Sequence, residues 1–191
     1  VGQFGIGQSV RRKEDFRLLE GKGQYADDYH LPGETYAYFV RSPHAHARLG
    51  AVEVAAAKKA PGVIAVFTHA DVSQAKLGTI KCMAPIKNAD GSAPFNPGRT
   101  LLASDRVRQV GEPVAMVVAA NRYLAEDAAG LVAVEYDEED AVVTIADARS
   151  GPVVHPTTES NVAQVMVIED DEDLEEALAK APHLVSRTIV H

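Results

Sequence analysis

A single stretch of the sequence, from Thr35 to Thr68, constrains the fold most, because it contains a complete packing unit in order. Its opening residues, Tyr36 to Val40, are aromatic and β-branched, which favours a pleated and half-buried backbone. Ser42-Pro43 ends that strand, because proline lacks the amide that a central strand needs. Pro61-Gly62 stops a run of good helix formers. The unit predicts a strand at 36–40, a strand at 47–54, a short helix at 55–60 and a strand at 63–67.

A second unit follows the turn at Gly111-Glu112-Pro113. Residues 114–120 form an apolar run that is short enough for a strand covered on both faces. Asn121 is suited to cap a helix over 122–130, whose apolar side chains recur at near-helical spacing. Residues 132–136 then alternate as a strand. The order strand, helix, strand predicts a right-handed crossover if the two strands are parallel neighbours.

Glycine and proline mark the remaining connections. They accumulate between Asp71 and Thr100, where periodicity fades, and this predicts a long loop. Further along, the sequence predicts a short strand at 142–145, a helical turn at 146–150, a loop from Gly151, a strand at 162–168, a helix over 174–181 and a final strand at 184–190.

The chain divides into three segments. Residues 1–34 are rich in glycine and predict an extended N-terminal arm, with Phe16, Leu18 and Leu19 anchoring it to the body. Residues 35–150 predict an α+β domain with a mixed sheet and short packed helices. Residues 151–191 are interpreted as a linker and the truncated start of a following region, because the last predicted strand runs into His191 without a turn or cap.

Composition excludes several classes of function. The 191 residues are 46% hydrophobic and 24% charged, which is ordinary for a globular protein. The net charge of -8 argues against nucleic acid as a partner, since Arg11-Arg12-Lys13 is the only basic run. No apolar run approaches a membrane span, and Val1-Gly2-Gln3-Phe4 does not resemble a signal peptide. The single cysteine, Cys82, fits the reducing cytoplasm, where we expect the protein to reside.

Five separated blocks resemble one family, in order, across essentially the whole chain. They are 7–15 (GQSVRRKED), 19–28 (LEGKGQYADD), 39–47 (FVRSPHAHA), 61–63 (PGV) and 107–115 (VRQVGEPVA). They look like the opening of the large subunit of molybdenum hydroxylases, the family of xanthine dehydrogenases, aldehyde oxidases and aerobic carbon monoxide dehydrogenases. Glu112 departs from the pattern, because the family more often has glutamine before this proline.

The resemblance implies an α/β hammerhead domain that precedes the cofactor-binding region of a much longer subunit. In that family the molybdopterin contacts and the catalytic glutamate lie beyond the residues matched here. We therefore assign no catalytic, cofactor-binding or metal-binding residue to this chain. The parent subunit is expected to carry molybdenum-molybdopterin, with iron–sulfur clusters and FAD on partner subunits or domains. Whether the subunit forms a homo-oligomer is left open.

Four sequence patterns are candidates for a metal, phosphate or catalytic site, and each has a simpler explanation. His44 and His46 could donate two metal ligands, but no cluster of further ligands is near in sequence, so polar turn residues are the better interpretation. The glycines at 2, 5, 7, 21 and 23 lack the strand and helix of a phosphate-binding loop. Cys82 has only Lys81 and Lys87 nearby, which favours an unreactive thiol. His155 and His183 are isolated in the sequence.

The charged runs have simpler explanations as well. Glu135 to Asp140 and Glu169 to Glu176 lack the spacing of a calcium-binding loop, which favours solvated turns and a helix start. Arg11-Arg12-Lys13 suits pairing with acidic surface elsewhere in the subunit, although surface pairs contribute only about 0 to 1 kcal/mol.

Two hypotheses remain, and a third is weaker. The chain is either a structural domain of a molybdenum hydroxylase large subunit, inert by itself, or a free-standing binding or interaction module with the same fold. A small hydrolase is disfavoured because no Gly-x-Ser-x-Gly motif is present. The reading frame beyond His191 discriminates the first two, since only the first requires a long continuation.

Overall fold

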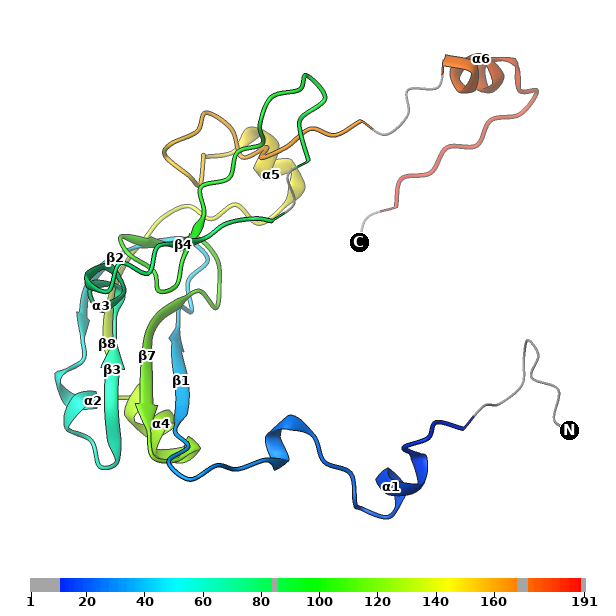
Figure 1. Ribbon diagram of the computed structural model, residues 1–191. Coiled ribbons are helices and arrows are strands. Elements are labelled where there is room, and N and C mark those ends of the chain that lie inside the picture. The colour runs from blue at the N-terminus through cyan, green and yellow to red at the C-terminus, as the bar shows by residue number, and fades with distance from the viewer. Residues whose placement is uncertain (1–10, 84–85, 168–171, 190–191) are drawn as a thin grey trace, which may run out of the picture.

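The computed structural model describes residues 11–83, 86–167 and 172–189. The chain has the shape of an open C, in which an N-terminal arm and the segment beyond about residue 140 extend to one side of a compact body (Figure 1). The strands are β1 Tyr36–Arg41, β2 Ala47–Glu53, β3 Val63–Phe67, β4 Thr79–Ile80, β5 Arg99–Thr100, β6 Arg106–Val107, β7 Pro113–Ala119 and β8 Ala133–Glu138. The helices are α1 Asp15–Leu19, the 3-10 turn η1 Ala26–Asp28, α2 Ala55–Lys59, α3 His69–Gln74, α4 Arg122–Ala129, α5 Ile145–Ser150 and α6 Glu172–Lys180.

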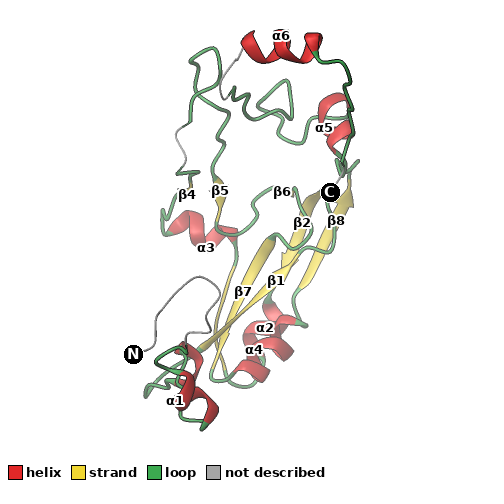
Figure 2. Cartoon of the chain, turned by 90° about the vertical axis from the view of Figure 1, so that its right-hand side faces the viewer, coloured by secondary structure: helices red, strands yellow, loops and turns green. Residues whose placement is uncertain are grey.

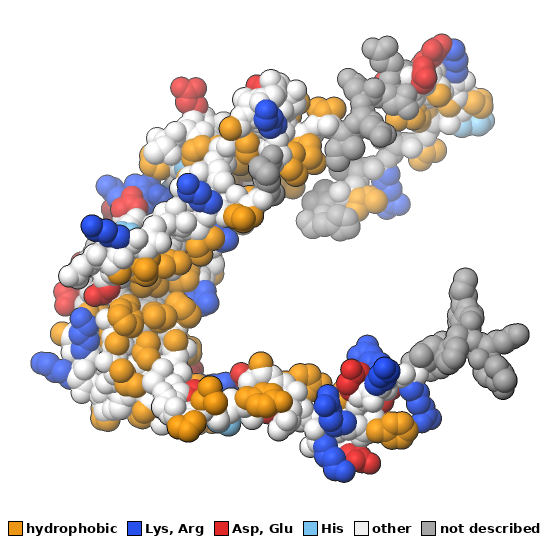
Figure 3. All heavy atoms as spheres, in the orientation of Figure 1, with side chains coloured by type: hydrophobic (Ala, Val, Ile, Leu, Met, Phe, Trp, Pro, Cys, Tyr) orange, Lys and Arg blue, Asp and Glu red, His pale blue; other side chains and the backbone are white. Residues whose placement is uncertain are grey.

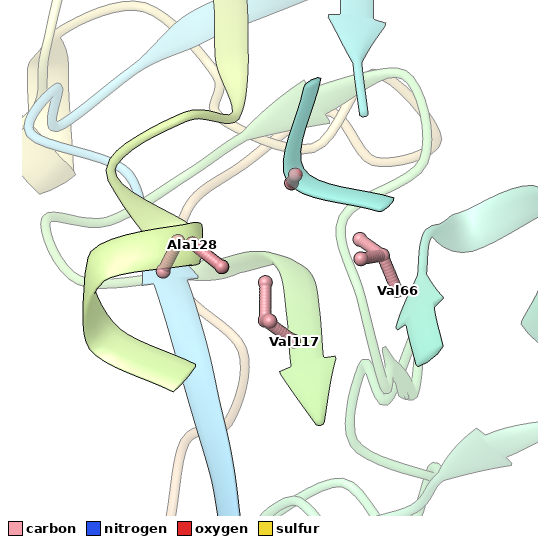
Figure 4. Packing of buried hydrophobic residues seen from close by; sticks show 5 residues of the cluster. Val66, Val117 and Ala128 are labelled. Atoms are coloured by element: carbon pink, nitrogen blue, oxygen red, sulfur yellow. The ribbon is translucent and has the colours of Figure 1, made fainter. Parts of the chain in front are cut away.

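Strand β7 is the centre of the first sheet, whose order is β1-β7-β3. Val117 lies opposite Tyr38 on one side and Val66 on the other, so these side chains share a face. Helices α2 and α4 cover that face, and Val117 packs with Val66, Ala57 and Ala128 (Figure 4). The predicted strand at 114–120 and the helix laid over it are confirmed.

A β-bulge links the two cores of the body. The register with β1 passes from Val40↔Ala115 to Arg41↔Pro113, which leaves Val114 as the extra residue. A bulge turns the extra side chain away from strict alternation. Val114 and Ala115 are consequently both buried, at 1% and 0% exposed. Val114 packs with Ala47, Ala103 and Val107 in the core of the second sheet.

The second sheet has the order β6-β2-β8. Every strand pair among the described residues is antiparallel, so the predicted mixed sheet is wrong, although the α+β class is confirmed. The crossover from β7 through α4 does not make β7 and β8 neighbours. Strands β1 and β3 already occupy both sides of β7, and the chain after α4 therefore continues into the other sheet (Figure 2).

The predicted long loop at 71–100 contains regular structure. Helix α3 begins at His69, where Thr68 and Asp71 form a reciprocal capping box. The hydrogen bond from the Thr68 amide to Asp71 lowers the pKa of that carboxyl. Further on, β4 and β5 pair with each other. The sequence prediction missed α3 because a helix of six residues is too short to show periodicity.

Three predicted strands are absent from the described residues. Thr144 caps α5 by accepting a hydrogen bond from the Asp147 amide at 3.1 Å, which places 142–145 outside any sheet. Residues 162–167 are irregular, yet Ala163 and Val165 accept backbone bonds from Phe95 and Ala89 at 2.9 Å each. Residues 184–189 pair with no strand. In each case the segment is rich in apolar and β-branched residues, and no continuous partner strand lies beside it within the described residues.

The described part of the N-terminal arm, residues 11–34, extends away from the body (Figure 1), but its apolar residues do not anchor it there. Phe16 and Leu19 are 66% and 86% exposed. Asp27 and Arg122 form an ion pair between the arm and α4 at 3.6 Å. Separately, no helix in the described ranges is both long and apolar enough to cross a membrane.

Replacing Val117 with aspartate is expected to unfold the domain. Val117 is 0% exposed, so the carboxylate would be desolvated without a partner or would take up a proton. The cost of several kcal/mol is comparable with a total stability of about 5 to 15 kcal/mol. Val143→Asp makes the same chemical change at a valine that is 79% exposed, and it should shift the melting temperature little. Equal melting of the two variants would show that β7 is not the buried centre of the sheet.

Candidate functional site

The densest group of charged side chains in the body surrounds Glu139, at the end of β8. Its carboxylate lies 3.2 Å from Arg48 Nε, 3.2 Å from an Arg106 terminal nitrogen and 3.3 Å from His46 Nε2. We call these four residues the Glu139 cluster. The Glu139 side chain is only 25% exposed, so solvent screens these interactions less than at the open surface.

Strand register brings the Glu139 cluster together. Arg48 of β2 lies directly opposite Arg106 of β6 and Asp137 of β8. Two arginines facing each other across a strand pair repel. Glu139 sits between them and pairs with both, and Asp137 adds a further ion pair to Arg48 at 3.3 Å. The acidic residues at the end of β8 therefore fasten β6 and β8 to β2, which is more than the solvated turn that the sequence predicted.

His46 is 8% exposed and faces oxygen atoms at both ring nitrogens. Its Nδ1 lies 2.9 Å from the carbonyl oxygen of Asp140. Because a carbonyl can only accept, Nδ1 carries a proton and donates it. Nε2 and the Glu139 carboxylate approach to 3.3 Å without the alignment of a hydrogen bond. The His46 ring thus connects β2 with the end of β8.

His44 lies beside this cluster with a different set of contacts. Its Nδ1 is 3.4 Å from Glu138, and its ring packs on Tyr136 at 4.7 Å between centroids. Burial raises the pKa of the Tyr136 hydroxyl. In the part of the chain that the structure describes, no three His, Cys, Asp or Glu side chains are placed to hold a metal ion. The contacts of both histidines are with β8 and the turn that follows it.

A groove of about 540 Å³ lies between the body and the segment after residue 151. Glu112 lines it and accepts a hydrogen bond from the Arg108 amide at 2.6 Å. His155 lines the same groove and packs edge-on against Phe95 at 5.5 Å. Burial, followed by the nearby Arg108 charge, lowers the pKa of His155. His155 is therefore not isolated, and the residues that surround it are too distant in the sequence to have signalled this.

The other sequence candidates lie apart from these groups. Gly21 has φ +69, and a Cβ on Gly23 would come within 2.5 Å of Leu18, so both serve the arm's turns. Glycines 2, 5 and 7 fall outside the described residues. Cys82 is exposed, and its amide donates to Asn96 at 3.4 Å. His183 is exposed in the C-terminal segment.

The charged runs of the sequence have local partners. The Arg12 amide donates to the Asp15 carboxylate at 3.0 Å, so the basic run leads into α1. In α6, Glu176 pairs with Lys180 one turn later. Residues 168–171, which include the first part of the predicted acidic run, fall outside the described ranges.

These groups supply structure and no complete catalytic apparatus. Among the described residues, no serine, threonine or cysteine side chain hydrogen-bonds a histidine ring, which is the pairing that activates such nucleophiles. The buried charges neutralise one another across strands. The described residues do not fit a molybdenum centre, because no three His, Cys, Asp or Glu side chains among them converge on one point.

Comparison with known proteins identifies the family. The family described as "Aldehyde oxidase and xanthine dehydrogenase, a/b hammerhead domain" matches residues 20–140. This chain belongs to that family. The hammerhead fold and the large-subunit resemblance predicted from the sequence are thereby confirmed.

Several relatives share most of this chain. The nicotine 6-hydroxylase large subunit of Paenarthrobacter nicotinovorans is 39% identical over 182 residues, which are 95% of this chain and 21% of the relative. The carbon monoxide dehydrogenase large chain of Afipia carboxidovorans is 41% identical over 133 residues, 70% of this chain and 15% of the relative. These relatives are hydroxylases and dehydrogenases, and the chain corresponds to one domain of their large subunits.

The chain also superposes on solved structures of related enzymes. Quinoline 2-oxidoreductase from Pseudomonas putida 86 superposes with a TM-score of 0.69 at 41% identity, over 81% of this chain and 19% of that one. Carbon monoxide dehydrogenase from Oligotropha carboxidovorans gives 0.72 at 32% identity, over 94% and 23%. The chain spans about a fifth of the length of the relatives it matches.

Neutralising Glu139 is expected to destabilise the hammerhead domain. Glu139→Gln would leave Arg48 and Arg106 without the carboxylate that pairs with both, and losing charged contacts of this kind costs about 1 to 3 kcal/mol. Glu138→Gln is the matched control, because the Glu138 side chain is 74% exposed and contacts only His44 among the described ion pairs. A surface change of that kind should stay within about 0.5 kcal/mol. Urea unfolding of both variants measures the difference, and equal stabilities would contradict the proposed fastening of β6 and β8.

Acid should loosen the groove around His155. A histidine whose folded pKa lies below its ordinary value of 6.5 stabilises the fold fully above that value, and this contribution falls as the pH drops through 6.5 towards the folded pKa. Hydrogen-exchange protection across residues 151–161, corrected for the slower intrinsic exchange of amides at lower pH, should therefore decrease between about pH 7 and pH 5. His155→Phe keeps an aromatic ring against Phe95 and removes the titration. That variant should lose the pH-dependent decrease in protection, whereas an unchanged decrease would show that another group controls it.

Proposed function

We propose that the chain is the hammerhead portion of the large subunit of a molybdenum hydroxylase. The complete enzyme would hydroxylate a carbon centre with oxygen from water, or oxidise carbon monoxide. Electrons would pass to iron–sulfur and FAD groups on partner subunits or domains. Residues 35–150 are the hammerhead domain in this proposal, 1–34 are its arm, and 151–191 lead into the following region.

The exposed area is the observation that carries the proposal. The structure exposes 15308 Å², whereas a compact monomer of 20.4 kDa exposes about 8,800 Å². Large apolar side chains contribute to the difference, and among them are Leu19, Leu31, Val143 and Val185, at 86%, 76%, 79% and 92% exposed. A chain that folded for independent existence would cover such side chains. A domain built into a larger subunit covers them with its neighbours.

The role assigned to the domain is structural. Its charged residues hold its own strands together, as the Glu139 cluster shows, and the described residues offer no fitting ligands for molybdenum. The cofactor would be held by parts of the subunit outside these 191 residues. One relative is named the molybdenum-binding subunit of a xanthine dehydrogenase and another a subunit of a dehydrogenase complex, which supports a multi-subunit enzyme. We place that enzyme in the cytoplasm.

The alternative is a free-standing interaction module with the same fold. The extended arm and exposed apolar side chains would also suit a protein that wraps a partner. The two proposals differ in what the gene encodes beyond His191. The large-subunit proposal requires a continuation about three times as long as this chain, because 81% and 94% of this chain match only 19% and 23% of the solved chains.

Elemental analysis and turnover test the main proposal. The full-length subunit, purified with its partner subunits, is expected to contain stoichiometric molybdenum and to reduce an electron-accepting dye with an N-heteroaromatic compound, an aldehyde or carbon monoxide. The 191-residue chain alone is expected to bind no molybdenum and to show no turnover. Stoichiometric molybdenum in the isolated chain, or its absence from the complete complex, would contradict the assignment.

A further inference from the structure

The β1-β7-β3 sheet has a second face that carries apolar side chains in register. Phe39 of β1, Met116 of β7 and Phe67 of β3 are directly opposite one another and form one row across all three strands. Ala37, Val118 and Ala65 form the next row. On β7, Met116 and Val118 flank Val117, whose side chain faces α2 and α4. Successive side chains of a strand point to opposite faces, so both rows point away from these helices. We call these six residues the open face.

The open face has the composition of a covered surface. None of its six side chains is polar or charged, whereas a sheet face that meets water normally alternates to polar residues. Phe39 and Phe67 are 38% and 37% exposed, and Met116 and Val118 are half-buried. The Arg41 guanidinium stacks over the Phe39 ring at 5.6 Å, at the edge of the face. Figure 3 shows hydrophobic side chains gathered over β3 and β7 on this side of the body.

The size of the open face limits what can cover it. Two rows on three strands measure roughly 14 Å by 14 Å, about 200 Å², from the usual strand spacing and residue rise. A stable complex of separate molecules buries about 800 Å² on each partner. The open face is therefore too small to hold a second copy of this chain by itself. A contact of this size is sufficient when both surfaces belong to one polypeptide, because linkage supplies a high effective concentration.

We propose that the open face is the docking surface for an apolar element of the same large subunit, from the four-fifths of its length that the relatives carry and residues 1–191 do not match. This inference rests on the proposed function. The docking element would close the first sheet as a third layer, opposite α2 and α4. Phe39, Met116 and Phe67 would be its principal contacts, because they are the largest side chains of the two rows.

Thiol labelling tests the proposal without relying on a destabilising variant. Phe67→Cys is made in a Cys82→Ser background, since Cys82 is the only cysteine of residues 1–191 and is exposed, and labelling is read at residue 67 by peptide mass spectrometry. Ile64→Cys is the matched control on the same strand. Ile64 is 60% exposed and is the extra residue of a bulge between Val63 and Ala65, outside the paired rows. Each variant is labelled as the 191-residue chain and as the full-length subunit in its complex.

In the full-length subunit, labelling of the Phe67→Cys variant is expected to slow at least about tenfold relative to the isolated chain. That factor corresponds to a modest opening free energy of about 1.4 kcal/mol. The Ile64→Cys control should change far less. Equal rates for the Phe67→Cys variant in both contexts, or equal slowing of both variants, would overturn the proposal. Slowing in the isolated chain that grows with its concentration would assign the face to a second copy instead, and a gene without a continuation would also overturn it.

Failure of this inference is separable from failure of the proposed function. Molybdenum content and dye reduction are measured on the same full-length preparation. A Phe67→Cys subunit that contains molybdenum and turns over, while its introduced thiol reacts as freely as in the isolated chain, would refute the docking surface and leave the assigned function intact.

Discussion

The pairing of β7 on both sides is the constraint on which the body depends. Strand β7 pairs with β1 on one side and with β3 on the other, and Val117 places an apolar side chain against the helices that follow β2 and β7. The bulge at Val114 then directs a neighbouring side chain into the second core. Strand β7 thus contributes a side chain to each hydrophobic cluster. Each cluster is built mainly from alanine and valine, so close approach of the backbones, rather than bulk, provides the packing.

In the second sheet, ion pairs add to the apolar packing and help to hold a very short strand in place. Strand β6 has only two residues and pairs with β2 at only two positions, which is too few backbone bonds to fix a strand securely. Glu139 compensates by bridging Arg48 of β2 and Arg106 of β6. The arrangement also explains why acidic residues crowd the end of β8: with one carboxylate removed, the facing arginines would repel.

The sequence was informative where a partner lies close along the chain and uninformative where the partner is distant. The apolar run at 114–120 and the helix after Asn121 are visible because local pattern and capping coincide there. The pairing of Glu139 with Arg106, or of His155 with Phe95, depends on contacts across dozens of residues, which no local pattern encodes. The same limit explains why the strands predicted at 142–145, 162–168 and 184–190 are absent from the described residues of these segments. A segment of apolar and β-branched residues forms a strand only where a partner strand is present.

Several apolar side chains outside the body are exposed, and this exposure bears on how the domain is used. Phe16 and Leu19 on the arm, and Val165 and Ile189 near the other end, have the composition of buried residues and remain exposed. The inner body, by contrast, has two hydrophobic clusters formed by its own strands and helices. Two kinds of sequence are therefore joined in one chain: a core whose contacts are internal, and extensions whose apolar side chains have no surface to meet within the described residues. Burial of those side chains would release free energy only on contact with further protein, at about 25 cal/mol for each Å² covered. In the proposed large subunit, the extensions would therefore act as attachment points on either side of the body.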